Sequence, residues 1–266
     1  MTTIAVLGSI TRDRILITKK NLDFSQPGGA VYYASRTLAS LGVNVIAIPL
    51  LAKQDEALLR ALQHPKIQIL PQWTCVTTCY QNTYPADSLD ICEKKILSMT
   101  SDFSISKNLF EAVRSCGAIH LAPLSSQECH VDLFKTLRKN YSGIISIDGQ
   151  GFTRGPQLNV QTLLTGNIDI IKVDEEESAA LGCLVRWGIP EVLITKASRG
   201  STVFFEGRAH EVRAYPAQKI VDATGCGDAY MAGYLKQRLV GADPVKAADF
   251  AARIGAKNLE CKGALS

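Results

Sequence analysis

The sequence predicts an α/β fold, a doubly wound and mainly parallel sheet sandwiched by helices, on three observations. Apolar runs typical of buried strands, such as 4–7 and 44–51, stand between stretches with helical spacing. From residue 107 onward, helices and strands alternate at the spacing of right-handed βαβ crossovers, which build parallel sheets. A glycine-rich stretch at 222–228 runs directly into an apolar helical run, as a loop does that feeds a helix N-terminus.

The composition fits one large domain over residues 1–266, because 46% of the residues are hydrophobic and suffice for a sizeable core. Lys and Arg number 29 against 25 Asp and Glu, scattered along the chain rather than gathered in the basic stripe of a nucleic-acid binder. We therefore expect no nucleic-acid partner. The chain shows neither a basic leader nor an apolar stretch of roughly 18 residues, so we expect a cytoplasmic enzyme without a membrane partner.

The eight cysteines are scattered without a Cys-x-x-Cys pair, which is the pattern of free thiols in a reducing compartment. Cys129 and His130 are adjacent, but two neighbouring ligands without a second pair do not predict a metal site. We expect ordinary surface or core positions for both.

The first strand, at 4–7, is followed by Gly8 as a turn and by Asp13 a few residues later. This is the carboxyl end of the strand, where open α/β sheets bind ligands, although a solvated loop carboxylate is the alternative. The later elements follow from periodicity in the same way. We expect strands at 44–51, 67–70, 74–80, 118–122, 144–147, 168–173, 191–195 and 202–205, a loop at 82–87, and helices beginning at Asp55 and spanning 109–114, 131–139 and 244–258.

Gly28 and Gly29 precede a helical run over 30–41 that a glycine at position 42 ends. Two adjacent glycines before a helix let the backbone come close to a ligand. The sequence therefore predicts a second ligand-binding turn at the start of this helix.

The stretch at 222–228 carries the chemistry. At the first turn of a helix, the backbone N–H groups of Gly225, Cys226 and Gly227 have no intrahelical partners and can bind a phosphate. Asp228 follows at once, placed to take a proton from an alcohol that attacks the held phosphate. An ordinary capped helix is the alternative. A dinucleotide fingerprint would need a third glycine where Tyr230 stands, and the Gly-Lys-Ser/Thr of a P-loop does not occur.

This stretch, Asp-Ala-Thr-Gly-Cys-Gly-Asp, resembles the Asp-Thr-x-Gly-Ala-Gly-Asp signature of the ribokinase-like (PfkB-type) carbohydrate kinases. The resemblance implies a ribokinase-like fold, Asp228 as catalytic base and an anion hole made by the amides of residues 225–227. Ala223 stands where the family usually has Thr, and Cys226 where it has Ala. Neither change removes a backbone donor.

The resemblance extends to the acceptor side. The Gly-Gly helix is similar to the family's first signature, except that Tyr33 stands where an Asn often contacts sugar hydroxyls, and Asp13 matches an Asp that binds the same hydroxyls. Asp148 and Arg154 lie in an Asp-x-Gln-Gly-x-x-Arg pattern similar to one in inositol-type members, with a turn Asp and a surface Arg as the alternative. The family's small β lid is expected from segments near 11–27 and 74–100, reduced in size because both are short.

The donor side resembles the family in three places. The carboxylates at 174–177 lie where the family has Asn-x-x-Glu, whose Glu organises Mg²⁺ through water, although such a run is usually a solvated helix start. Residues 196–200 are similar to the nucleotide loop, with Ala197 replacing its first glycine, and the last helix borders adenine in the family. The resemblance thus implies Glu177 for the metal, and for the nucleotide Asp174, Thr195, Lys196, Ser198, Gly200, Thr224 and Asn258.

Together these features predict an ATP-dependent kinase that transfers the γ-phosphoryl group to a hydroxyl of a small polyol, sugar or nucleoside, with Mg²⁺ and a monovalent cation such as K⁺ as cofactors. No Lys/Arg cluster is evident beside Asp13, Gly28, Gly29 and Tyr33, so we favour a neutral polyol such as myo-inositol. A nucleoside kinase, using an aromatic wall from Tyr32, Tyr33 and the region of Trp73, is the first alternative. A non-catalytic binding protein on this fold is the second, and the presence of Asp228 opposes it. A monomer and a homodimer are both open.

Cys226 prompts a conditional hypothesis, because a thiol at a helix N-terminus meets the conditions that lower a cysteine pKa. If the thiol is accessible, its alkylation should block turnover. The alternative is a side chain that points back into the protein as a small hydrophobe.

Overall fold

The computed structural model describes residues 3–18, 21–84, 93–101, 103, 106–129, 131–154 and 159–265. Residues 19–20 and 85–92 of the expected lid segments, including part of the expected loop at 82–87, lie outside the described residues, as does His130.

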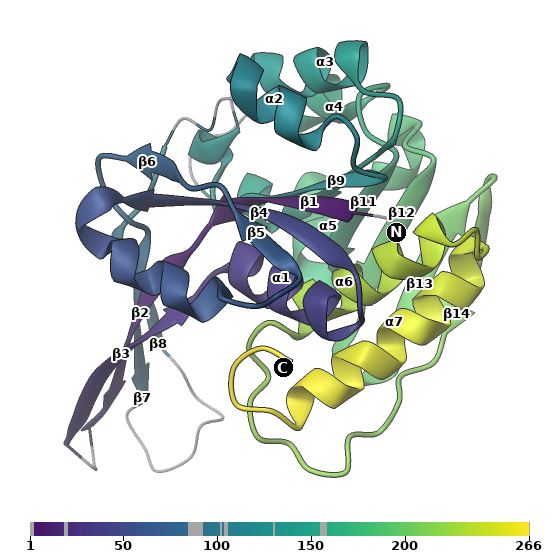
Figure 1. Ribbon diagram of the computed structural model, residues 1–266. Coiled ribbons are helices and arrows are strands. Elements are labelled where there is room, and N and C mark those ends of the chain that lie inside the picture. The colour runs from purple at the N-terminus through teal and green to yellow at the C-terminus, as the bar shows by residue number, and fades with distance from the viewer. Residues whose placement is uncertain are drawn as a thin grey trace.

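The main sheet runs through the middle of the molecule (Figure 1). Over the described residues it has ten strands in the order β14-β13-β12-β11-β10-β9-β1-β4-β5, with β6 also paired to β4. All pairs from β12 to β5 are parallel, and only β13 and β14 run antiparallel, which confirms the mainly parallel sheet. The bounds are β1 Thr3–Ser9, β4 Asn44–Ala52, β5 Ile67–Ile69, β6 Gln72–Thr74, β9 Ala118–Ala122, β10 Ile144–Asp148, β11 Ile170–Asp174, β12 Glu191–Thr195, β13 Ser201–Phe205 and β14 Arg208–Val212.

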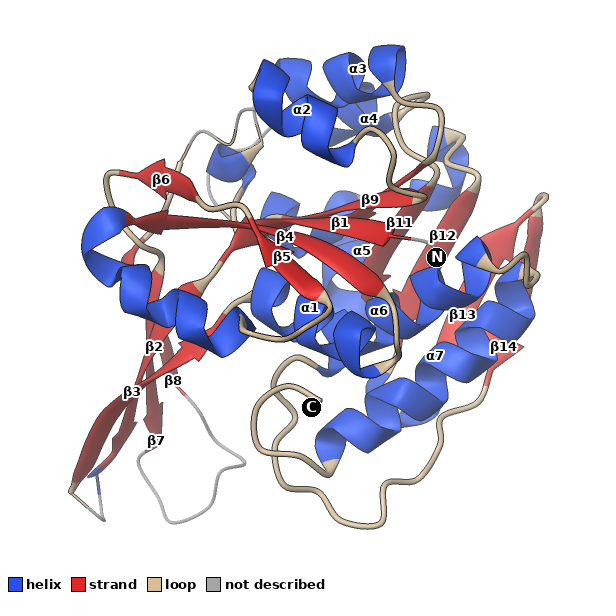
Figure 2. Ribbon diagram, in the orientation of Figure 1, coloured by secondary structure: helices blue, strands red, loops and turns tan. Residues whose placement is uncertain are grey.

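Helices cover both faces of this sheet (Figure 2). Side chains alternate along a strand, so Val6 and Leu7 of β1 enter two different apolar cores. Leu7 packs with Phe134 of α3, and Val6 with Leu38 of α1 and Tyr234 of α6. One face carries α2 Lys107–Val113, α3 Val131–Asn140 and α4 Val160–Leu164; the other carries α1 Ala30–Ser40, α6 Cys226–Leu239 and α7 Pro244–Leu259.

A second, smaller sheet projects from the carboxyl ends of β1 and β4 (Figure 1). Its order is β3-β2-β7-β8, in which β2 and β7 are parallel and the outer pairs antiparallel. This sheet is the expected lid. Its strands are β2 Thr11–Ile17, β3 Leu22–Gly28, β7 Cys79–Tyr84 and β8 Glu93–Ser98.

Two local predictions were wrong. The strand expected at 74–80 is divided between β6 and β7, because the hydroxyls of Thr77 and Thr78 bind backbone N–H groups of Ala52 and Thr100 in place of a strand ladder. The α-helix expected from Asp55 is a 3₁₀ helix, Lys53–Leu62, in which Asp55 departs from helical geometry (φ −99°, ψ 16°). Its carboxylate accepts a hydrogen bond from Arg12 of the lid at 3.3 Å.

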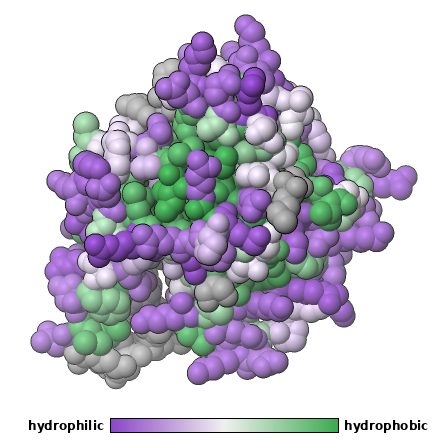
Figure 3. All heavy atoms as spheres, in the orientation of Figure 1, coloured by the Kyte–Doolittle hydropathy of each residue, from purple (hydrophilic) through white to green (hydrophobic). Residues whose placement is uncertain are grey.

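The surface in Figure 3 is mostly polar on the outer helices, with apolar side chains gathered over the β4–β5 edge of the sheet. No described helix is both long enough and apolar enough to span a bilayer.

Candidate active site

Three predicted site residues meet at one edge of the main sheet. Asp148, Asp174 and Thr195 are the last residues of the neighbouring strands β10, β11 and β12. The register pairs Asp148 with Lys172 and Asp174 with Thr195. Carboxyl ends of parallel strands form the ligand-binding edge of an open α/β sheet, so the strands themselves bring these side chains together.

Two helices begin at this edge without a side-chain cap. Gly29 precedes α1 with φ 91°, and Gly225 precedes α6 with φ 76°, and neither N-terminus receives a side-chain hydrogen bond from the described residues. By contrast, Asp174 caps α5 (Glu175–Leu181) and Asp243 caps α7. Cys226 N already donates to Ala223 O at 3.4 Å, but no side chain occupies the other first N–H groups of α1 and α6, and the positive end of the helix dipole favours an anion there.

Asp13 lies on β2, where the lid leaves the main sheet. Its carboxylate is buried against Gly28 and accepts a hydrogen bond from Thr11 Oγ1 at 2.7 Å. A Cβ at position 28 would overlap Asp13 Oδ2, which explains the glycine by close approach. The first signature of the sequence thus adjoins Asp13, as expected for one site.

Tyr33, on the first turn of α1, connects this region to α6. Its ring is buried against Gly225. Burial, and then the charges of Asp222, Asp13 and Asp228, raise the pKa of Tyr33 well above its ordinary value. The hydroxyl therefore lies within electrostatic reach of carboxylates on both sides of the site.

Asp228 occupies the first turn of α6 and is buried. Its pKa is raised to about 7, chiefly by burial and then by the charge of Asp148, with a smaller contribution from Glu177, while Lys172 and Arg154 oppose the shift. A carboxylate with a pKa near neutrality can both hold and release a proton at ordinary pH.

Arg154 is half-buried and contacts the lid. Its guanidinium lies 3.5 Å from the Tyr80 hydroxyl on β7 of the lid, and its charge acts on Asp228. Asp148, in contrast, is fully buried, and both of its oxygens are occupied: one accepts from Gln150 N at 3.1 Å, and the other from Lys172 at 2.6 Å. In this structure Asp148 stands behind the site rather than open to an acceptor.

Glu177 and Asp174 form a capping box at the start of α5. Glu177 N donates to Asp174 Oδ1 at 2.8 Å, and Asp174 N donates to Glu177 Oε2 at 2.9 Å. The helix-start alternative is therefore correct as a local structure. Burial, and then the charge of Asp148, raise the pKa of Glu177.

The described residues suit a magnesium ion bound mainly through water and substrate phosphates. Among the described residues, no three His, Cys, Asp or Glu side chains form a metal-ligand group. Mg²⁺ commonly keeps several waters and takes one or two carboxylates together with substrate phosphates. The second oxygen of Glu177 suits such a water-mediated position, since only Oε2 serves the capping box.

The loop after β12 stands beside α6. Ser201, the first residue of β13, shares a 2.9 Å hydrogen bond between its hydroxyl and that of Tyr230. Lys196 pairs with Glu211 at 2.9 Å, and Ser198 lies in a 3₁₀ turn, Ala197–Arg199. Ala197 has φ 50°, a left-handed conformation that favours glycine.

Asn258 supports the glycine loop from α7. Its amide donates to Thr224 O at 3.0 Å and to Cys226 Sγ at 3.5 Å, and the side chain is fully buried. Thr224 itself is exposed. Burial raises the pKa of Cys226, and Asp222 and Asp228 add to it against the Asn258 hydrogen bond. Burial outweighs the Asn258 hydrogen bond, so the conditional hypothesis of a lowered thiol pKa gives way to its alternative, a side chain that points back into the protein.

The family model for pfkB family carbohydrate kinases matches residues 1–266. The chain belongs to that family. It is 32% identical over 75 residues to a nucleoside kinase of Methanocaldococcus jannaschii and 25% identical over 171 residues to a ribokinase of Arabidopsis thaliana. These matches cover 28% and 58% of this chain, but only 25% and 44% of the two relatives.

Solved structures of ribokinase-family kinases share the whole architecture. A pyrophosphate-dependent kinase of the ribokinase family, complexed with a pyrophosphate analog and myo-inositol, has a TM-score of 0.83 at 24% identity, over 99% of this chain and 97% of that one. Arabidopsis thaliana ribokinase complexed with ribose and ATP has a TM-score of 0.78 at 18% identity, over 99% and 94%. At these identities the likeness establishes the fold.

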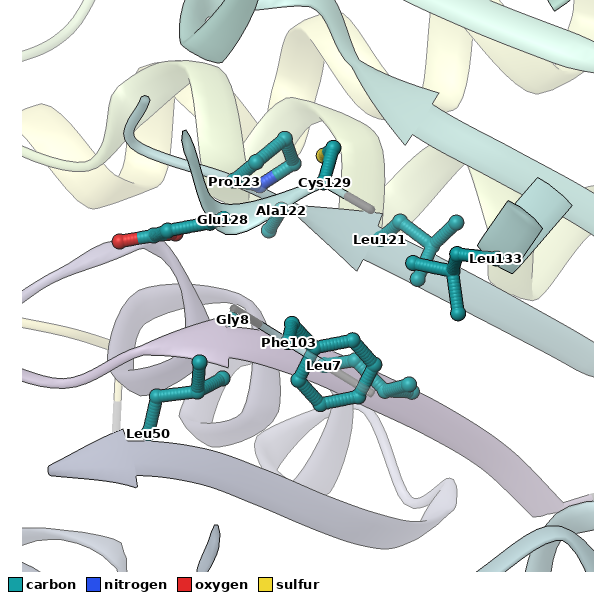
Figure 4. A pocket seen from close by; sticks show the side chains of 10 residues that line it. All are labelled: Leu7, Gly8, Leu50, Phe103, Leu121, Ala122, Pro123, Glu128, Cys129 and Leu133. Carbon is teal, nitrogen blue, oxygen red and sulfur yellow. The ribbon is translucent and has the colours of Figure 1, made fainter. Parts of the chain in front are cut away.

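Sequence reasoning missed two buried charges of this pfkB-family chain, Lys172 and Glu128. Glu128 accepts hydrogen bonds from Ser9 and Thr100 hydroxyls at 2.6 Å, where the lid joins the main sheet. In Figure 4 it borders a small apolar pocket with room for about one water, and its carboxylate turns away from the leucines. No motif marks either residue, because each is defined by partners far away in the sequence. The pocket residues are Leu7, Gly8, Leu50, Phe103, Leu121, Ala122, Pro123, Glu128, Cys129 and Leu133.

Proposed function

We propose that this carbohydrate kinase transfers a phosphoryl group from a donor held at the N-terminus of α6 to a hydroxyl of a small neutral polyol, with Asp228 as general base. The observation that carries the proposal is the position of Asp228. Its buried carboxylate, with a pKa of about 7, stands beside the uncapped first turn of α6. A base within reach of a bound phosphate and poised near neutral pH is what alcohol phosphorylation requires.

The acceptor is proposed to lie between Asp13, the Gly28–Gly29 turn and Arg154. Carboxylate oxygens accept hydrogen bonds from hydroxyls, and the uncapped N–H groups of α1 donate to them. These groups suit a compound rich in hydroxyls, and we favour myo-inositol as its representative.

A nucleoside acceptor is the alternative within the family. It would need an aromatic wall, but Tyr33 is already packed on Gly225, and the Tyr32 hydroxyl lies 3.5 Å from Ala264 N at the end of the chain. Trp73 is partly covered by Lys53, whose ammonium lies 4.3 Å from the ring centroid. These aromatic side chains have partners within the protein, which favours the polyol.

In the proposed reaction, the N–H groups at Gly225–Gly227 hold the donor phosphate while Asp228 accepts the proton of the attacking hydroxyl. When bound, Mg²⁺ would neutralise charge on the phosphates, and Glu177 is the residue that would hold it through water. The protein thus contributes position and electrostatics rather than covalent chemistry. A monovalent cation such as K⁺ stays a prediction, supported by the buried Asn258 Oδ1, which lacks a hydrogen-bond partner among the described residues.

ATP is the donor we propose. The exposed side chains of Ile220 and Val221 precede the glycine turn and offer apolar surface to a purine ring, with the loop at Thr195–Gly200 proposed for the phosphates. Pyrophosphate is the second candidate, since a pyrophosphate-dependent kinase shares the fold with a TM-score of 0.83. Pyrophosphate would need only the phosphate-binding part of the site and no surface for a purine ring.

The test is a matrix of both donors against myo-inositol, ribose, hexoses and nucleosides, with phosphorylated products detected by ³¹P nuclear magnetic resonance. We expect a phosphorylated polyol and no product with Asp228→Asn above a low residual rate. Preference for a sugar phosphate or a nucleoside over every neutral polyol would overturn the acceptor assignment. Turnover with pyrophosphate but not ATP would reassign the donor and leave the role of Asp228 intact.

A further inference from the structure

Lys172, on β11, is a buried cation that the reaction outlined above does not use. Only 6% of the residue is exposed. A buried ammonium is unfavourable unless it is paired, so its position in the sheet demands a compensating interaction. That interaction is with Asp148, directly behind the candidate active site.

The ammonium is held from two sides. Lys172 Nζ lies 2.6 Å from Asp148 Oδ2, and the other oxygen of Asp148 is fixed by Gln150 N. On the other side, a Cβ at Gly227 would lie 2.8 Å from Nζ. Gly227 has no positive φ, so its glycine is explained by the room that it leaves for the ammonium. Lys172 therefore touches the first turn of α6, one residue before Asp228.

The charges that act on Asp228 come from several elements. Asp148 ends β10, Glu177 lies on α5, and Arg154 lies in the segment after β10. Three carboxylates in this cluster face two cations. Arg154 is partly exposed, and its hydrogen bond to the lid is long, whereas Lys172 is buried in the main sheet and paired with Asp148.

Tyr33 of α1 completes the surroundings, since the charge of Asp228 contributes to its raised pKa. Burial lowers the pKa of Lys172, but Asp148, Asp228 and Glu177 outweigh burial and raise it, so the side chain stays protonated. The same ammonium opposes the upward pKa shift of Asp228.

We propose that Lys172 is a positioning residue for phosphoryl transfer: it locks Asp148 in place and serves as the fixed counter-charge of Asp228 at the first turn of α6. The inference rests on the proposed function, because it assumes that Asp228 is the base. Asp148 then acts through Lys172, as a balancing charge, and not by touching the acceptor.

The test is the pH profile of kcat/KM, measured at constant Mg²⁺ with the best donor and acceptor. Lys172→Met removes the cation and should move the acidic limb to higher pH by about one unit, the usual effect of an opposite charge nearby. Asp148→Asn removes a repelling carboxylate and should move that limb to lower pH. The double variant, which leaves no unpaired buried charge, should lie between the two. Lys246→Met, which removes an exposed cation of α7 that pairs with Asp243, should leave the profile unchanged.

Two outcomes separate the proposals. If Asp228→Asn is inactive but both single variants keep the wild-type midpoint while losing rate, Lys172 is merely structural and the inference is wrong. If Asp228→Asn retains wild-type kcat, the base assignment fails instead. Circular dichroism of each variant checks the fold, and the double variant keeps the test decisive should Lys172→Met alone fail to fold.

Discussion

The ring of Tyr33 occupies the space that a side chain at position 225 would need. A Cβ built on Gly225 would overlap Tyr33 Cδ1, and Gly225 also has φ 76°, a conformation that favours glycine. The uncapped N-termini of α1 and α6 are therefore locked together by one aromatic ring. The two glycine turns, before α1 and before α6, are parts of a single packed unit.

This contact predicts a strong coupling between positions 225 and 33. Gly225→Ala should lower the free energy of unfolding by at least about 1–2 kcal/mol from the left-handed backbone alone. Overlap with the Tyr33 ring should lower the free energy of unfolding further. Part of this further loss should disappear in the double variant that also carries Tyr33→Ala. Urea unfolding of the two single variants and the double variant measures the coupling, and strict additivity would contradict the packing described.

The raised pKa of Asp228 predicts that the free energy of unfolding depends on pH. Its pKa is raised on folding, so its stabilising contribution is fully present below its unfolded value of about 3.9 and is lost as pH rises through about 7. Asp228→Asn removes this loss. In the absence of ligands, the variant should gain stability relative to the wild type as pH rises from roughly 5 to 8. Urea titrations at the two pH values check it, and an unchanged difference would argue against the raised pKa.

Ala197 and Gly200 give a matched pair in the loop after β12. Both are left-handed, with φ 50° and 91°. Ala197→Gly should leave stability unchanged or raise it by up to about 1 kcal/mol, as strain relief offsets the greater freedom of the unfolded chain. Gly200→Ala should destabilise, because its Cβ would also overlap Val212 O. Thermal unfolding of the pair decides this, and a destabilising Ala197→Gly would count against it.

Substitutions in the capping box can distinguish the structural role of Glu177 from its proposed role in Mg²⁺ binding. Glu177→Gln keeps a side chain that can cap the helix, so stability should change little. Its apparent Mg²⁺ requirement should rise roughly 10-fold, as for a lost outer-shell partner. Asp174→Ala should instead cost about 1 kcal/mol of stability through the lost cap. Equal Mg²⁺ dependence in Glu177→Gln and wild type would remove Glu177 from the proposed metal site.

The sequence was informative where periodicity or a motif was strong. The apolar strands at 4–7 and 144–147 and the helix from Pro244 appear as expected, since burial on both faces of a parallel sheet imposes continuous apolar runs. The lid strands β3 and β8 were not individually predictable. They are largely exposed, so no alternation of apolar residues marks them.

The site residues likewise divide into those that a motif marks and those that only distant contacts define. Asp228 and its glycines follow from a contiguous motif, whereas Lys172 lies within an apolar strand and gains its meaning from Asp148, 24 residues away. Asp55, in the 3₁₀ helix at Lys53–Leu62, accepts a hydrogen bond from Arg12 of the lid, a contact that local propensity does not encode. Arg154 likewise contacts Tyr80, on a different sheet.

The most direct measurement of the central claim is the turnover of Asp228→Asn with the best donor and acceptor pair. We expect kcat to fall by roughly 10²-fold to 10⁴-fold, the range for a positioned general base, while donor binding measured by calorimetry is retained. Lys246→Met serves as a surface control with wild-type kcat. A kcat of Asp228→Asn near that of the wild type, with the same acceptor, would show that Asp228 is not the base and contradict the account.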